Sequence, residues 1–143
     1  MTAVRYRSMQ PEDFNSLYEL WTTTPGVDVT RADTPEGLER FLNRNPGLSF
    51  VAESGGQIVA AIMCGHDGRR GFIHHLVVYT PFRRQGIAST LVNRSMSTLE
   101  LIDIEKCHLF IRRENKMGLK FWESLGWKER LELTMASYTF DTM

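Results

Sequence analysis

An apolar strand that runs into a glycine-containing turn and then into a long helix is the most constraining feature of this 143-residue sequence. Residues 72–79 (FIHHLVVY) are apolar enough for a central strand, and residues 85–101 carry apolar side chains at helical spacing. The first N–H groups of a helix have no partner inside it and lie at its positive end, so this turn suits a phosphate or pyrophosphate. Gly86 removes a side chain where a phosphate must approach the backbone, and Arg83 and Arg84 add positive charge.

The same turn has a simpler interpretation, as a strand-to-helix connection that uses a glycine and carries solvated arginines. The charge of the whole chain bears on this choice, because 17 Lys+Arg oppose 17 Asp+Glu and the formal net charge is zero. A general polyanion binder normally has a basic excess, so nucleic acid is disfavoured as a partner. Positive charge concentrated in one turn favours a focused anion site instead.

The other segments alternate between helical and strand periodicity, which predicts one mixed α/β domain over residues 1–143. Further strands are expected at residues 4–9, 48–53, 57–64 and 106–111, with one or two more between residues 127 and 140. Helices are expected to start at Pro11, after Thr34-Pro35, near Gln85 and after Asn115. The buried stripe of the long helix is predicted to be Ala88, Val92, Met96, Leu99 and Ile102.

Hydropathy predicts a cytoplasmic protein without a membrane partner. The longest strictly apolar run, residues 58–64, has seven residues, whereas a membrane span needs roughly 20. The first residues have no apolar core of signal-peptide length. Cys64 and Cys107 each lie in an apolar stretch, so both are interpreted as small buried side chains rather than as a disulfide framework.

The sequence RRQGIA at residues 83–88 resembles the Arg/Gln-x-x-Gly-x-Gly/Ala motif of the GCN5-related N-acetyltransferases, the GNAT superfamily. A second set of residues fits that family's Asn-x-x-small-x-x-aromatic-aromatic-x-x-x-Gly-aromatic pattern: Asn115, Gly118, Phe121, Trp122, Gly126 and Trp127. Element order and length also fit, so the resemblance covers essentially the whole chain and points to a bacterial branch. It implies a central mixed sheet in which the parallel strands at 72–79 and 106–111 splay apart, flanked by about four helices.

The resemblance also implies acetyl-CoA as acetyl donor, with no metal. The residues that match the pyrophosphate-binding role are Arg83, Arg84, Gln85, Gly86, Ile87, Ala88 and Ser89. Leu76, Val77 and Val78 would offer backbone groups to the pantetheine, and an N–H near Val78 would polarise the thioester carbonyl like an oxyanion hole. Asn115 would contact the cofactor or an ordered water near it; a plain helix N-cap is the alternative, and both can hold.

The acid and base are where the chain departs from the family. Trp122 stands where many members have a Tyr acid, and its indole N–H does not titrate in this range. Phe110 stands where some members have a Glu base. His75 is the candidate substitute base, because strand alternation places it on the face of the strand that is turned away from the long helix. An unperturbed His pKa near 6.5 suits the deprotonation of an amine near neutral pH. The alternative is a strand histidine satisfied by a neighbour; His74 is expected to face the long helix.

Two further residues are candidates for acceptor binding. Asp67 would contact a cationic acceptor, or it simply forms the turn in HDGRRG. Trp21 lies at the end of the first helix, before the irregular loop TTTPGVDVTRAD, in the region that shapes the acceptor site in the family. For most of the chain's aromatic residues, helical spacing favours core packing instead.

These observations predict an acetyl-CoA-dependent N-acetyltransferase that acts on a primary amine, either a small molecule or a peptide N-terminus, by direct attack in a ternary complex. The alternative is a non-catalytic acetyl-CoA-binding sensor or interaction module, motivated by the missing acid and base. A third reading is a nucleotide- or nucleic-acid-binding α/β domain. The acceptor and the oligomeric state stay open, and the C-terminal strands are the place to look for a homodimer.

Overall fold

Five strands form one mixed sheet in the computed structural model, which describes residues 3–141. The strands are β1 (Val4–Ser8), β2 (Phe50–Ser54), β3 (Gln57–His66), β4 (Gly71–Val78) and β5 (Cys107–Leu109), and they lie in the sheet in this order. The first three pairings are antiparallel and the last, between β4 and β5, is parallel. The mixed α/β class and the parallel pair are therefore confirmed.

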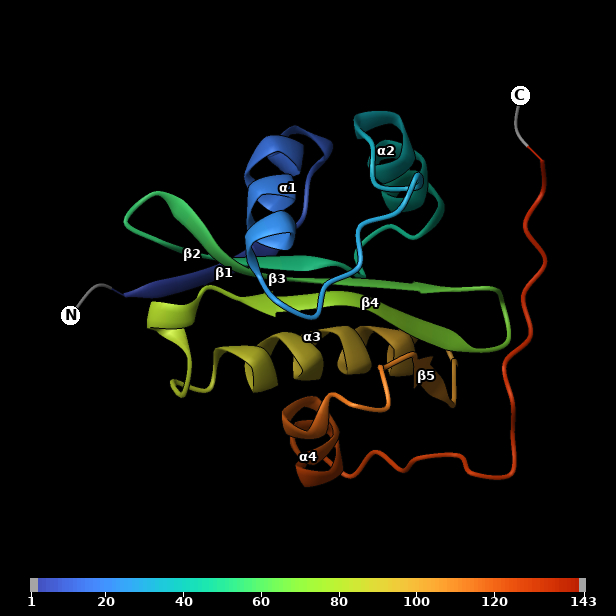
Figure 1. Cartoon of the computed structure of the whole chain (residues 1–143). Coiled ribbons are helices and arrows are strands. Elements are labelled where there is room, and N and C mark those ends of the chain that lie inside the picture. The colour runs from blue at the N-terminus through green and yellow to red at the C-terminus, as the bar shows by residue number, and fades with distance from the viewer. Residues whose placement is uncertain (1–2, 142–143) are drawn as a thin grey trace. The chain divides into compact units, whose positions relative to one another are not determined.

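Helices cover both faces of this sheet (Figure 1). Helices α1 (Phe14–Thr23) and α2 (Pro35–Arg44) lie on one face, and α3 (Ile87–Leu101) lies on the other. A short 3-10 turn precedes α1 at Pro11–Asp13, and another precedes α3 at Thr80–Phe82. These elements belong to one compact unit, Met1–Arg112, and α4 (Lys116–Ser124) belongs to a second, Arg113–Met143.

Local sequence signals explain most of the boundaries. The Thr34 side chain accepts a hydrogen bond from the backbone N–H of Gly37, and Pro35 occupies the first helical position, so α2 begins as the sequence predicts. Gly55 and Gly56 have φ of +59° and +79° and form the tight connection between β2 and β3.

The core on the α1–α2 face joins α1, α2 and three strands. Leu17, Leu20, Trp21 and Leu38 from the helices pack with Val51, Ala61, Met63 and Val77 from the sheet. Because Val77 of β4 belongs to this cluster, one face of β4 is turned toward α1 and α2.

The core stripe of α3 differs from the prediction. Val92 and Leu99 are buried as expected, whereas Ile102 is 46% exposed and lies just beyond the helix. The full buried set of α3 is Ile87, Leu91, Val92, Ser95 and Leu99. Ser95 escaped the pattern because it is polar; its hydroxyl donates to the buried carbonyl of Leu48 at 2.7 Å, which satisfies the group inside the core.

The predicted strands between residues 127 and 140 are wrong, because the structure has no helix or strand at these positions. The segment does contain alternating apolar residues, and several of its large side chains are exposed, among them Leu131, Leu133, Met135, Tyr138 and Phe140. Alternating apolar and polar residues indicate that a segment suits a sheet, but a strand forms only where a neighbouring strand pairs with it. No helix of the described residues is long and apolar enough to cross a membrane.

Candidate functional site

The parallel strands β4 and β5 pair over three positions and then part. The paired residues are Gly71 with Cys107, Phe72 with His108, and Ile73 with Leu109. Beyond Ile73, β4 continues to Val78 with a partner on its β3 side, but no β5 partner is found among the described residues. The splay predicted for these strands is therefore confirmed. It leaves one backbone edge of β4, from His74 to Val78, without a ladder, so an extended ligand can use it.

The end of this free edge leads into the start of α3. Gly86 is the N-cap of α3, with φ +79° and ψ 9°, a left-handed conformation that favours glycine. A Cβ built on Gly86 would meet nothing within 4 Å, so the space beside its backbone is open. The first N–H groups of α3 are thus reachable from outside.

Helices α1 to α4 differ in how their first N–H groups are satisfied. Helix α1 has no side-chain cap, but it continues from the 3-10 turn Pro11–Asp13, so the N–H of Phe14 bonds to the Pro11 carbonyl. Thr34 caps α2 and Asn115 caps α4, each accepting a hydrogen bond from the third helical residue. Gly86 has no side chain, and the structure records no side-chain cap for α3. Uncapped N–H groups at a positive helix end are the ordinary binding site for an anion. The geometry thus favours an anion site over a plain connection.

The residues around Gly86 give this site its charge. Arg83 and Arg84 are exposed, and the backbone of Arg84 has φ +63°. The Arg83 Nε donates to the Val78 carbonyl at 3.3 Å, which holds the side chain against the end of β4. Ile87 is 3% exposed and anchors the first turn of α3 in the core. The next two residues, Ala88 and Ser89, are half-buried, and Gln85 is exposed.

A β-bulge in β4 sets the direction of both histidines. Met63 pairs with His74 and Ala61 pairs with Val77, so β4 advances three residues while β3 advances two. His74 and Val77 therefore point to the same face: the His74 ring lies 5.8 Å from that of Phe41 in α2, and Val77 joins the α1–α2 core. The expectation that His74 faces the long helix is wrong, because strict alternation does not survive a bulge.

His75 lies within the bulge, with φ +47°, and its ring turns toward α1. The ring centroid is 4.9 Å from that of Trp21, and Nε2 lies 3.0 and 3.1 Å from the two carboxylate oxygens of Asp33. The prediction that His75 faces away from α3 is confirmed. The alternative interpretation, a strand histidine satisfied by a neighbour, also fits, because Asp33 is that neighbour. Asp33 was missed by sequence reasoning, since it is 42 residues away in the chain.

Trp21 belongs to the core, because it is 1% exposed. Its indole Nε1 is buried with no hydrogen-bond partner among the described residues. Its ring packs against that of His75, the candidate base.

The loop between α1 and α2 is tied to the sheet at two places. One is the contact of Asp33 with His75, and the other is the ion pair of Asp28 with Arg112, whose Nε lies 2.9 Å from the carboxylate. The hydrogen bond from Arg112 lowers the pKa of the Asp28 carboxyl. Because Arg112 follows β5 and His75 lies in β4, the loop reaches both diverging strands.

Asp67 lies in the turn between β3 and β4. Its Oδ1 accepts hydrogen bonds from the backbone N–H groups of Arg69 and Arg70, both at 2.8 Å. These bonds, led by that of Arg70, lower the pKa of the Asp67 carboxyl. The geometry is that of a turn former, at the end of β4 away from Gly86.

Asn115 and Trp122 lie in the second unit. The Asn115 Oδ1 accepts from the backbone N–H of Gly118 at 2.9 Å, as the capping interpretation predicts. Trp122 packs against Trp127, with ring centroids 4.7 Å apart. Phe110, the residue after β5 in the first unit, is 62% exposed and stacks on Phe72. Neither Trp122 nor Phe110 offers a titratable group.

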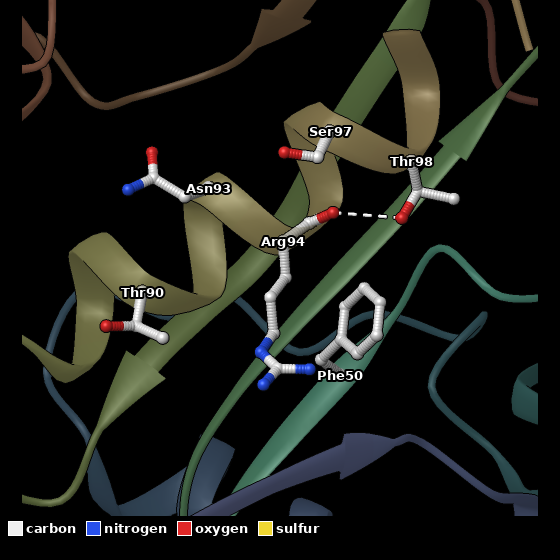
Figure 2. Close-up of a pocket in the computed structure, with 6 residues that line it drawn as sticks. All are labelled: Phe50, Thr90, Asn93, Arg94, Ser97 and Thr98. Carbon is white, nitrogen blue, oxygen red and sulfur yellow. Dashed lines mark hydrogen bonds between the residues drawn. The ribbon is translucent and has the colours of Figure 1, made fainter. Parts of the chain in front are cut away.

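A shallow groove lies elsewhere, along α3 and β2 (Figure 2). It is lined by Phe50, Thr90, Asn93, Arg94, Ser97 and Thr98. The Arg94 guanidinium lies over the rings of Tyr6 and Phe50, at 5.2 and 6.0 Å from their centroids. None of the predicted site residues lines it. The described residues contain no group of three or more His, Cys, Asp or Glu placed to hold a metal ion.

Known proteins share both this sequence pattern and this fold. Residues 14–127 match the acetyltransferase (GNAT) family. A curated acetyltransferase of Pectobacterium atrosepticum is 35% identical over 124 residues, which cover 85% of this chain and 86% of that protein.

Two solved structures share the fold at low sequence identity. PaiA N-acetyltransferase from Thermoplasma acidophilum, in complex with coenzyme A, has a TM-score of 0.77 at 18% identity, covering 88% of this chain and 90% of that one. An aminoglycoside acetyltransferase from an uncultured soil metagenomic sample, in complex with sisomicin, has a TM-score of 0.74 at 19% identity, covering 98% and 97%. The family match and the identity to the Pectobacterium protein show that this chain belongs to the GNAT family of acetyltransferases.

Proposed function

We propose that this protein transfers the acetyl group of acetyl-CoA to a primary amine, carried by a small molecule or by a peptide N-terminus, and that residues 1–143 act as one N-acetyltransferase domain. The observation that carries the proposal is the divergence of β4 from β5 on the way to the uncapped start of α3. A free strand edge suits the extended pantetheine, and a positive helix end suits the diphosphate. The relative PaiA was solved with coenzyme A, which has both parts.

The donor would be held mainly by backbone. The N–H groups at the start of α3 would bind the pyrophosphate, with Gly86 leaving room for it and with Arg83 and Arg84 supplying positive charge. The strand residues Leu76, Val77 and Val78 would pair with the pantetheine. An N–H near Val78 would point at the thioester oxygen, where negative charge grows during attack.

The transfer itself needs few groups beyond this framework. The amine nitrogen attacks the acetyl carbon, the C–S bond breaks, and coenzyme A leaves as its thiolate. We assign His75 as the base that takes the proton from the amine. Trp122 cannot protonate the thiolate, because its indole N–H does not titrate in this range, so we assign that proton to water. Asn115, with its oxygen engaged in the cap, would offer its amide NH₂ to the donor.

A second candidate function is a non-catalytic acetyl-CoA sensor. The observation in its favour is that Trp122 and Phe110 occupy the two positions at which the family resemblance leads us to expect an acid and a base. Such a protein would bind acetyl-CoA tightly and transfer nothing.

One experiment separates the two. The purified protein is incubated with acetyl-CoA and, separately, with three acceptor probes: sisomicin, spermidine and a peptide with a free amino terminus. An acetyltransferase releases thiol in step with the mass of one acetyl group gained by at least one probe. Saturable binding of acetyl-CoA without transfer to any probe supports the sensor. Displacement of bound coenzyme A by ATP or RNA would instead support the nucleotide-binding reading.

A further inference from the structure

Asp33 holds the ring of His75 through one nitrogen. Both carboxylate oxygens lie close to Nε2, at 3.0 and 3.1 Å. The contact is sheltered, since the side chains of Asp33 and His75 are 7% and 16% exposed. A carboxylate accepts hydrogen bonds, so in the neutral ring the proton must lie on Nε2. The structure records no partner for Nδ1 among the described residues.

The carboxylate of Asp33 is itself fixed by its own turn. The backbone N–H of Thr30 donates to Asp33 Oδ2 at 2.8 Å, and the backbone N–H of Asp33 donates to the Thr30 carbonyl at 3.0 Å. The next residue, Thr34, is the N-cap of α2, so the turn leads straight into a helix. The side chain of Asp33 therefore has little conformational freedom where it contacts His75.

The other side of the ring is fixed as well. The indole of Trp21 packs against it, and Trp21 is 1% exposed. The backbone of His75 has φ +47°, a conformation that costs a non-glycine residue free energy and that persists only where the surroundings enforce it. The bulge, the buried indole and the carboxylate thus together fix the orientation of one imidazole ring.

We propose that Asp33 is a positioning residue: it selects the Nε2–H tautomer of His75 and leaves Nδ1 as the atom that accepts the proton of the acceptor amine. This assignment rests on the proposed acetyl transfer. In the step, the N–H proton of the attacking amine moves to Nδ1, the amine nitrogen bonds to the acetyl carbon, and the C–S electron pair leaves with sulfur. Asp33 then faces an imidazolium and stabilises its charge. Two other titratable groups lie near this ring, Asp28 from the loop and His74 from β4, and the uncharged indole of Trp21 from α1 packs against it.

A double-mutant cycle tests whether Asp33 acts through His75. His75→Ala is expected to lower kcat by about 100-fold or more, as loss of a general base does. Asp33→Ala should lower kcat by no more than His75→Ala, with the KM for acetyl-CoA unchanged, and it should have no further effect when His75 is already Ala. Asp33→Asn no longer selects the tautomer, because its amide oxygen can accept from Nε2–H or its NH₂ can donate to Nε2, so its kcat should lie between those of wild type and Asp33→Ala. Glu36→Ala, which removes an exposed carboxylate three residues after Asp33, is the control.

A measurement on the resting protein separates this inference from the proposed function. In ¹H–¹⁵N NMR spectra at alkaline pH, His75 should show a protonated Nε2 and an unprotonated Nδ1. The ring N–H signal should be lost in His75→Gln, lost or shifted in Asp33→Ala, and retained in Glu36→Ala. An Nδ1–H tautomer, or an Asp33→Ala spectrum identical to wild type, would overturn the assignment even if transfer occurs. If Asp33→Ala still lowers activity in the His75→Ala background and raises the KM for the acceptor, then Asp33 contacts the acceptor and does not act through His75. The NMR result stands even if none of the three probes is acetylated.

Discussion

Ile73 of β4 and Leu109 of β5 form the last pair through which these two strands stay in register. From this pair onward β4 continues to Val78, where the turn to α3 begins, with no strand among the described residues pairing on that side. The free edge, the bulge at His75 and the helix start at Gly86 thus follow one another along fewer than twenty residues of chain. Under the proposed function, a single extended ligand would contact all three.

Asn115 has an observed role, the cap of α4, and a proposed role, contact with the donor, and substitution can separate the two. Its Oδ1 accepts from Gly118, so Asn115→Ala should remove the cap and cost about 1 kcal/mol of stability. Asn115→Asp keeps an acceptor for the cap but loses the amide NH₂, so we expect a near-normal melting temperature and coenzyme A binding weaker by about tenfold. Calorimetric titration with coenzyme A and thermal melts of both variants check this. Equal affinity of Asn115→Asp and wild type would leave Asn115 as a cap only.

Ser95 gives a prediction about stability alone. Its hydroxyl is fully buried and donates to the Leu48 carbonyl. Ser95→Ala leaves that carbonyl without its partner, so the free energy of unfolding should fall by about 1–3 kcal/mol. Ser97→Ala, on the exposed side of the same helix, is the control and should change stability little. Urea denaturation measures both. Equal effects of the two substitutions would mean that the buried hydrogen bond does not stabilise α3.

Asp67 should make stability depend on pH in the acid range. Its carboxylate accepts two backbone N–H groups, which lower its pKa in the folded state below the value of about 3.9 in an unfolded chain. The stabilisation is therefore present above that unfolded value and is lost as pH falls through the folded pKa. The melting temperature of Asp67→Asn should lie below that of wild type at neutral pH, and the gap should narrow in acid.

Asp103→Asn is a suitable control for this titration, since Asp103 is exposed and its left-handed backbone suits Asn. A gap between Asp67→Asn and wild type that stays constant from neutral to acid pH would rule out the carboxylate as its source.

The sequence was most informative where structure depends on neighbours in the chain. The helix start at Thr34-Pro35, the cap at Asn115, the paired glycines at 55 and 56 and the glycine turn before α3 all depend on a few neighbouring residues, and the structure has each of them. The splay of β4 from β5 was expected through family resemblance rather than from periodicity.

What the sequence could not supply depends on pairing across the sheet. The bulge at His75 exists only in the register between β3 and β4, so alternation misplaced His74. Asp33 reaches His75 across 42 residues, and nothing in the loop sequence distinguishes it from Asp28, the other acidic residue there. Ser95 is a polar member of a buried stripe whose partner, Leu48, lies 47 residues away. Residues 127–140 have the composition of strands, but the structure does not pair them.

Binding of coenzyme A to two glycine variants tests the central claim most directly. Gly86 and Gly56 both have φ +79° and both have open space where a Cβ would be, so Glu at either position carries the same backbone strain. Only Gly86→Glu places a carboxylate at the start of α3. We predict that Gly86→Glu remains folded but loses coenzyme A binding in a calorimetric titration, whereas Gly56→Glu binds like wild type. A folded Gly86→Glu protein that retains wild-type affinity would show that the diphosphate lies elsewhere and would contradict the account.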